Sequence, residues 1–160
     1  MNVLDFAMKM EADGKAYYEK LAAECDDKEL KNLFGLLADA EQAHYDALQA
    51  RKSETTYAWA ESQVLEQAKN IFQRLLEMKG KGAHKVDADG YSHAIKAEEQ
   101  SIEFYQVAAE KEQSPEVRRL LQDLADEEKI HLNIVENIYE FVEAPKFFLA
   151  WREFSNLKGL

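Results

Sequence analysis

The chain is poor in cysteine, proline and glycine, since its 160 residues include one cysteine, two prolines and six glycines. A single cysteine, Cys25, excludes both an intrachain disulfide framework and a metal site made of four thiolates. So few turn-forming residues favour long helices over a sheet of many strands. No apolar run approaches the roughly 20 residues that a membrane span needs, so we expect no membrane partner.

Basic residues are also scarce, because 20 Lys and Arg stand against 31 Asp and Glu and leave a net charge of −11. A surface of that sign repels phosphate backbones, so we expect no nucleic acid partner. The first residues, Met-Asn-Val-Leu-Asp-Phe, lack the basic and apolar regions of a signal peptide. We therefore expect a cytoplasmic protein, long enough to bury one core.

Four long segments carry apolar residues at helical spacing, and each segment predicts a helix. The predicted helices cover about residues 3–24, 28–51, 89–113 and 115–142. Asp27 and Ser114 stand just before the second and fourth helices, and Pro115 follows Ser114 at the first helical position. Both residues are therefore expected to cap the helix that follows them.

Short loops join the first helix to the second and the third to the fourth, so each pair predicts an antiparallel hairpin. The hairpins cover about residues 3–51 and 89–142, and a connection of about residues 52–88 joins them. One long connection between two hairpins is typical of a bundle with a crossover. The sequence thus predicts an all-α four-helix bundle that forms a single domain over residues 1–160.

Two further segments carry apolar side chains outside the four helices. Within the crossover, apolar residues from Val64 to Met78 repeat at helical spacing, which predicts a short extra helix. The last segment, residues 143–160, is rich in aromatic side chains. We expect this tail to pack on the bundle or on a second subunit rather than to face water.

The two hairpins are copies of each other, with an offset of 87 residues and no gap. Alanine and leucine matches carry little weight, because helices share a narrow composition. The matches that carry chemistry are two Glu-x-x-His motifs and two Glu-x6-Tyr motifs. They pair Glu11 with Glu98, Glu41 with Glu128, His44 with His131 and Tyr18 with Tyr105.

Charged residues interrupt the apolar stripes of all four helices. Burying an isolated carboxylate costs several kcal/mol, so four carboxylates that face one core would oppose folding. Two divalent cations would balance them, and residues at i and i+3 on a helix can supply two ligands to one centre. Two Glu-x-x-His pairs with one further glutamate from each remaining helix are typical of di-iron and di-manganese bundles. The predicted ligands, called the six-residue cluster below, are Glu11, Glu41, His44, Glu98, Glu128 and His131.

A single Glu-x-x-His motif is common on helices and is a weak signal by itself. Glutamates on helices usually belong to a solvated face, which is the expectation for Glu99, Glu103, Glu110 and Glu127. The repeat selects Glu98 over Glu99 and Glu128 over Glu127. Ligation by four carboxylates with one imidazole per metal favours iron(II) or manganese(II) over zinc.

Tyr18 and Tyr105 follow Glu11 and Glu98 by seven residues, two turns along the same helix face. Their hydroxyls are expected to bond ligand carboxylates or to supply an electron; the alternative is that both are buried aromatics whose hydroxyls have found some partner. Lys15 lies on the same inner stripe and is expected to pair with a ligand carboxylate or to reach solvent.

Three other polar residues fit no ligand pattern. His84 and His93 are expected on the surface. Cys25 is expected to be an unreactive residue at a helix end, because the neighbouring aspartates are not an electropositive setting.

In these residues the chain resembles the rubrerythrin-like branch of the ferritin-like superfamily. The resemblance rests on Met10-Glu11 through Tyr17-Tyr18, Ala40-Glu41-Gln42-Ala43-His44, Ala97-Glu98 through Phe104-Tyr105, and Glu127-Glu128-Lys129-Ile130-His131. It implies a ferritin-like bundle, often a homodimer, with two iron ions that hydrogen peroxide or dioxygen oxidises. The metal ligands of the family fall on the six-residue cluster.

The chain departs from the family pattern in two ways. Rubrerythrin proper has a rubredoxin domain with two Cys-x-x-Cys pairs, whereas this chain has one cysteine, so an external electron-transfer protein such as a rubredoxin is implied. The family also has an additional ligand glutamate near the position of Ser101 or Ile102. A symmetric site of six ligands is compatible with an oxidase or ferroxidase as well as a peroxidase.

The leading hypothesis is a non-haem di-iron oxidoreductase, with manganese as an alternative metal, that reduces peroxide or dioxygen in protection against oxidative stress. An alternative is a protein that binds or stores iron through ferroxidase activity. A third hypothesis is a structural bundle whose metal site is vestigial.

Overall fold

The computed structural model describes residues 2–53 and 88–143 of the chain. Within these residues the secondary structure is helical, without a strand. The extra helix expected between Val64 and Met78 and the aromatic tail of residues 144–160 lie outside the described residues, as does His84. The single-domain boundaries over 1–160 therefore stay a prediction.

Four helices form the described part of the chain, as the sequence predicts. They are α1 (Val3–Glu24), α2 (Lys28–Lys52), α4 (Ala88–Lys111) and α5 (Pro115–Glu143). Each bound lies within two residues of its predicted position. None of these four helices is long and apolar enough to span a membrane.

Side chains at the helix starts explain where three of the helices begin. Asn2 Oδ1 accepts the backbone N–H of Asp5 at 2.9 Å, at the start of α1. Asp27 Oδ1 accepts two backbone N–H groups at the start of α2, at 2.9 and 3.1 Å. Ser114 Oγ accepts the N–H of Val117 at 3.4 Å, directly before α5. The caps predicted at Asp27 and Ser114 are confirmed, and each satisfies N–H groups that a helix leaves free.

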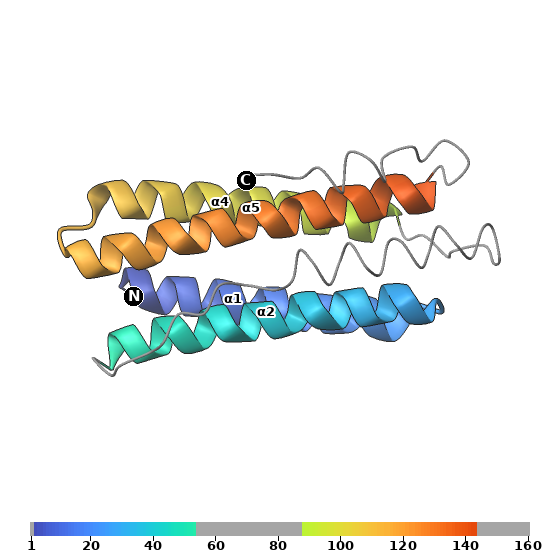
Figure 1. Cartoon of the computed structure of the whole chain (residues 1–160), viewed down its shortest axis with the longest axis horizontal. Coiled ribbons are helices and arrows are strands. Elements are labelled where there is room, and N and C mark those ends of the chain that lie inside the picture. Colours follow the sequence, from blue (N-terminus) through green and yellow to red (C-terminus); the bar gives the residue numbers. More distant parts are fainter. Residues whose placement is uncertain (1, 54–87, 144–160) are drawn as a thin grey trace.

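The helices pack as two antiparallel hairpins, α1 with α2 and α4 with α5, and the hairpins lie side by side (Figure 1). Contacts within each hairpin are extensive, and α1–α4 and α2–α5 contacts join the two. The end of α2 and the start of α4 lie at opposite ends of the bundle (Figure 1). This arrangement is the one that a bundle with a single crossover requires.

Two apolar clusters fill the bundle, one toward each end. One contains Leu33, Leu37 and Ile134, and the other contains Leu48, Leu121 and Leu124, all at most 1% exposed. Along every helix, the residues of the six-residue cluster fall between those of the two apolar clusters. The four helices therefore bring the charged residues to one level of the bundle, with apolar packing on both sides.

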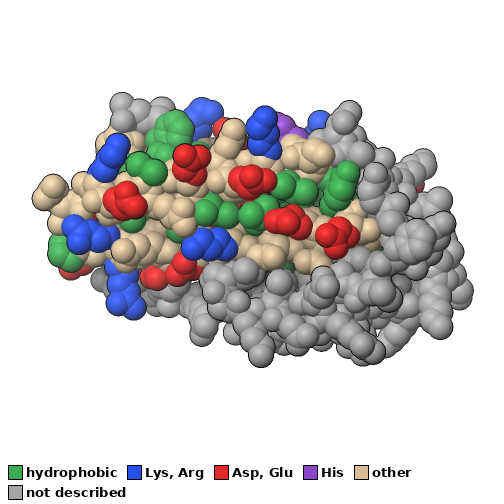
Figure 2. Space-filling view, turned by 90° about the horizontal axis from the view of Figure 1, so that it is seen from above, with side chains coloured by type: hydrophobic (Ala, Val, Ile, Leu, Met, Phe, Trp, Pro, Cys, Tyr) green, Lys and Arg blue, Asp and Glu red, His purple; other side chains and the backbone are tan. Residues whose placement is uncertain are grey.

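On the face of the described helices that Figure 2 shows, charges of both signs are dispersed rather than gathered. Figure 2 shows acidic and basic side chains interspersed over the described helices of one face, with apolar side chains between them. A dense group of carboxylates lies inside the bundle instead.

Candidate metal centre

All six residues of the predicted cluster are buried in the bundle interior. Their exposed fractions lie between 0% and 4%. The helices supply them unevenly, because α1 and α4 contribute one glutamate each while α2 and α5 contribute a Glu-x-x-His pair each. They are Glu11 from α1, Glu41 and His44 from α2, Glu98 from α4, and Glu128 and His131 from α5.

These residues form two overlapping groups of potential metal ligands. In each group, one oxygen or nitrogen of every residue lies within 4.8 Å of the others. The first group is Glu11, Glu41, His44 and Glu128, and the second is Glu41, Glu98, Glu128 and His131. Glu41 and Glu128 belong to both groups, which is the position of carboxylates that bridge two ions. The 87-residue repeat relates one group to the other.

Both imidazoles direct Nδ1 toward the carboxylates. His44 Nδ1 lies 3.3 Å from Glu11 Oε2 and 3.1 Å from Glu128 Oε1. His131 Nδ1 lies 3.0 Å from Glu41 Oε1 and 3.4 Å from Glu128 Oε2. The two rings are stacked, with centroids 5.2 Å apart and an angle of 11° between their planes. Each histidine thus offers the same nitrogen to the centre.

The carboxylates shift one another's pKa values because they share a buried site. Burial raises the pKa of Glu41, and the neighbouring Glu11 raises it further. Burial and the neighbouring Glu128 likewise raise the pKa of Glu98.

The pKa of Glu128 is shifted in the opposite direction. Burial raises it, but hydrogen bonds with Glu98, His131 and His44 outweigh burial and hold it well below its usual value. Burial lowers the pKa of His44, but Glu11 and Glu128 outweigh burial and raise it overall. Protons held by the groups with raised pKa values therefore compensate part of the negative charge of the six-residue cluster.

The donor set fits a pair of divalent cations. Four carboxylates and two neutral imidazoles carry a charge that two such ions would balance. Glu128 Oε2 is buried and lies 3.4 Å from His131 Nδ1, but it accepts no hydrogen bond from the described residues, so it is available to a cation. Oxygen-rich ligation with one imidazole per ion fits iron(II) or manganese(II).

The two candidate tyrosines bond to glutamates of the cluster, and each bond crosses between the hairpins. The Tyr18 hydroxyl donates to Glu98 Oε1, and the Tyr105 hydroxyl donates to Glu11 Oε1 at 2.5 Å. Burial, followed by the neighbouring carboxylates, raises the pKa of both phenols, so they remain protonated donors. The expected bond to a ligand carboxylate is therefore present in both hairpins.

A pocket of about 260 Å³ between α1 and α4 reaches the cluster. Its lining includes Glu41, Glu98 and Tyr18 at the inner side and the small residues Gly14 and Ser101. A Cβ at position 14 would lie 3.2 Å from Glu41 Oε2, so glycine permits the close approach of this helix to the carboxylate. The pocket is thus open beside Ser101, one of the two positions at which the sequence lacks a further glutamate.

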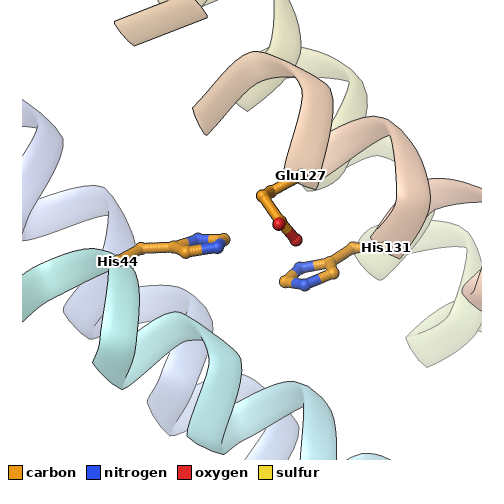
Figure 3. Close-up of side chains that lie close together, drawn as sticks. All are labelled: His44, Glu127 and His131. Carbon is orange, nitrogen blue, oxygen red and sulfur yellow. The ribbon is translucent and has the colours of Figure 1, made fainter. Parts of the chain in front are cut away.

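Glu127 is a correction to the sequence prediction, because it is not on a solvated face. Its side chain is 7% exposed, whereas Glu99, Glu103 and Glu110 are exposed as predicted. Figure 3 shows its carboxylate close to the rings of His44 and His131. Residue 127 precedes His131 by four positions, so both share one helix face. Its repeat partner is the buried Ala40, a signal that sequence reasoning did not use.

The remaining candidates lie outside the centre. Lys15 Nζ donates to Gln42 Oε1 at 2.8 Å and not to a carboxylate of the cluster. His93 is exposed as predicted, with its ring centroid 5.0 Å from that of Tyr17. Cys25 is partly buried, and burial raises the pKa of its thiol, which agrees with the prediction of an unreactive residue.

Comparison with known proteins gives one family and one fold. A family model described as Rubrerythrin matches residues 2–139. A solved structure of a hypothetical protein from Pyrococcus furiosus is similar, with a TM-score of 0.64 and 24% identity over 88% of each chain. That likeness shows a shared fold and nothing more specific. No curated protein sequence matches this chain.

Proposed function

This chain belongs to the rubrerythrin family, and from that premise we propose that it is a di-iron oxidoreductase that reduces hydrogen peroxide or dioxygen. The observation that carries the proposal is the pair of overlapping ligand groups that share Glu41 and Glu128. A centre with two metal positions and shared carboxylates suits a two-electron reaction. Its electrons would come from an external electron-transfer protein such as a rubredoxin, and we expect a homodimer in the cytoplasm.

Each residue of the cluster has a place in this proposal. Glu11 and His44 would hold one ion, Glu98 and His131 the other, and the two shared glutamates both. Two ferrous ions bound there would supply the two electrons that, with two protons, convert one hydrogen peroxide to two waters. Manganese also fits the donor set.

In this proposal the tyrosines orient two of the ligand glutamates, and the pocket gives the oxidant access to the cluster. The hydroxyls of Tyr18 and Tyr105 orient Glu98 and Glu11 through the bonds described above. Because both phenols are buried beside the carboxylates, they are also placed to supply an electron to an oxidised centre. The pocket beside Ser101 gives a small oxidant a path to Glu41 and Glu98.

Stopped-flow mixing of the anaerobic ferrous protein with hydrogen peroxide, and separately with dioxygen, tests the proposed reaction. We expect near-ultraviolet ferric absorption to develop faster than with the same concentration of free ferrous ion. The faster of the two oxidants identifies the substrate. Oxidation no faster than that of free ferrous ion would contradict the proposal.

Iron storage is the second candidate, because a six-residue cluster related by a repeat also suits ferroxidase chemistry. Storage requires a large assembly that accumulates many irons per chain. Size-exclusion chromatography combined with iron titration separates the two functions. We expect a dimer that takes up about two ions per chain, in keeping with the two ligand groups, and a large shell with many ions would instead support storage.

The pocket predicts the path by which the oxidant reaches the six-residue cluster. Ser101→Leu should fill the pocket and lower the rate of oxidation by peroxide by about tenfold, which corresponds to about 1.4 kcal/mol in the barrier. Ser92→Leu is the matched control, since Ser92 is exposed on the same helix. Metal content should stay the same in both variants. A wild-type oxidation rate in Ser101→Leu would show that the oxidant enters elsewhere.

A further inference from the structure

Glu127 is a buried acidic residue that the six-residue cluster does not use. Within residues 2–53 and 88–143, its Oε2 atom has no hydrogen-bond partner, and the buried Nε2 atom of His131 has none either. One ligand atom each of His44, Glu127 and His131 lies within 4.8 Å of the other two. Figure 3 shows the carboxylate directed toward the imidazoles. A buried carboxylate and a buried ring nitrogen, both without partners, therefore face the same small space.

The nitrogen available to Glu127 is Nε2 of His131, because Nδ1 already faces the carboxylates of the cluster. That Nδ1 atom lies 3.0 Å from Glu41 Oε1. An imidazole that gives the Nδ1 lone pair to a cation keeps its proton on Nε2, and that N–H can only donate. A carboxylate is the strongest acceptor for such a donor.

We propose that Glu127 is a positioning residue, which accepts a hydrogen bond from the Nε2–H of His131 when the centre holds metal. This inference rests on the proposed metal site and deepens it. Such a bond fixes the tautomer and the ring orientation of a metal-binding histidine and increases its basicity. Oε2 of Glu127 lies on the same face of α5, one turn before His131, so little rearrangement is required.

The bond makes the two halves of the centre unequal. At the repeat position of Glu127, α2 carries Ala40, so His44 has no such carboxylate on its own helix. The bond to Glu127 therefore strengthens the position of Glu98 and His131 through a residue that α2 lacks at the matching repeat position, which sequence symmetry alone would not predict.

Titration of the metal-free chain with Co²⁺, in competition with a chromophoric chelator, tests this inference. We expect two ions per chain, and Glu127→Ala should weaken the binding of one of them on the order of 10- to 100-fold. Glu127→Gln should weaken it less, because the amide oxygen still accepts a hydrogen bond. Asp126→Ala is the matched control, since Asp126 is the adjacent acidic residue and is exposed.

Two further readouts separate positioning from a structural role. In the Zn²⁺-loaded, ¹⁵N-labelled protein we expect a slowly exchanging Nε2–H signal of His131 that Glu127→Ala removes. The melting temperature of the metal-free protein should not fall in Glu127→Ala, because the repeat position already carries alanine. A lower melting temperature with unchanged Co²⁺ affinity would overturn the inference in favour of a structural role.

The number of ions taken up in the titration also tests the positioning role of Glu127. Uptake of three ions by the wild type and two by Glu127→Ala would make Glu127 a ligand of a third ion and overturn the positioning role. Two-ion uptake that is independent of residue 127 overturns this inference and leaves the proposed function intact. No uptake by the wild type overturns both.

Discussion

Replacing Glu41 and Glu128 together by alanine is expected to reduce metal binding from two ions per chain to none. These two glutamates are the residues shared by both ligand groups, so their loss leaves each position with one glutamate and one histidine. The expected change is complete, because a divalent ion in a buried site needs more protein ligands than these. Elemental analysis after anaerobic loading with ferrous ion measures it.

The double variant also distinguishes a working site from a vestigial one. Its matched control is Glu99→Ala with Glu103→Ala, which removes two exposed glutamates of α4. In the metal-free double variant the loss of Glu41 removes repulsion between buried carboxylates, whereas the loss of Glu128 removes a hydrogen-bond partner of His44, so circular dichroism is needed to verify that the variant is still folded. If neither the variant nor the wild type takes up metal, the site is vestigial.

Metal loading is expected to stabilise the wild-type protein strongly. A ligand at 100 times its dissociation constant contributes about 2.7 kcal/mol, so two ions contribute about 5 kcal/mol. For a chain of this size that corresponds to an increase of about 10–20 °C in the melting temperature. Calorimetry with and without metal, in the wild type and in the double variant, measures the difference.

This stabilisation is expected to grow as the pH rises. The pKa values of Glu41 and Glu98 are raised in the folded state, first by burial and then by neighbouring carboxylates. The stability that such groups contribute is fully present below their usual pKa of 4.5 and is lost as the pH rises through the raised value. His44, whose pKa is raised above 6.5 by Glu11 and Glu128 against the effect of burial, changes stability in the same direction. Glu128 acts oppositely, because its lowered pKa contributes stability that is lost only as the pH falls below 4.5.

The metal-free protein should therefore lose stability as the pH rises above 4.5 and through the raised pKa values of Glu41, Glu98 and His44, while the loaded protein should not, because the ions displace these protons. Calorimetric titration in buffers of different ionisation enthalpy should accordingly detect proton release on metal binding. A metal-induced increase in melting temperature that does not change as the pH rises above 4.5 would contradict the assignment of protonated carboxylates.

Much of the fold could be read from the sequence, because helix signals are local. Capping by Asp27 and Ser114 and the apolar spacing between them depend on neighbouring residues, and all four helices begin and end within two residues of expectation. The repeat also selects four glutamates that the structure buries, although one Glu-x-x-His motif alone could not, and it passes over the buried Glu127. Identical spacing in two hairpins requires the same helix face in both, which is a geometric constraint.

Contacts between the hairpins could not be read in the same way. Spacing along α1 places Tyr18 on the face of Glu11, but the acceptor of its hydroxyl is Glu98, which depends on how two helices dock. The burial of Glu127 was missed for a related reason. A glutamate beside a ligand glutamate was assigned to solvent by its residue type, whereas its position, four residues before His131, already placed it on the inner face.

The crosswise tyrosine bonds have a consequence for how such a centre originates. Tyr18 of the first hairpin donates a hydrogen bond to Glu98 of the second, and Tyr105 of the second donates one to Glu11 of the first. In neither hairpin does the tyrosine bond the ligand glutamate of its own hairpin; each hairpin supplies the tyrosine that bonds the ligand glutamate of the other. Two identical hairpins that associate about a twofold axis would satisfy every one of these bonds. The present chain thus resembles two such hairpins joined by one covalent connection, and Ala40 against Glu127 is one repeat position at which the two hairpins differ.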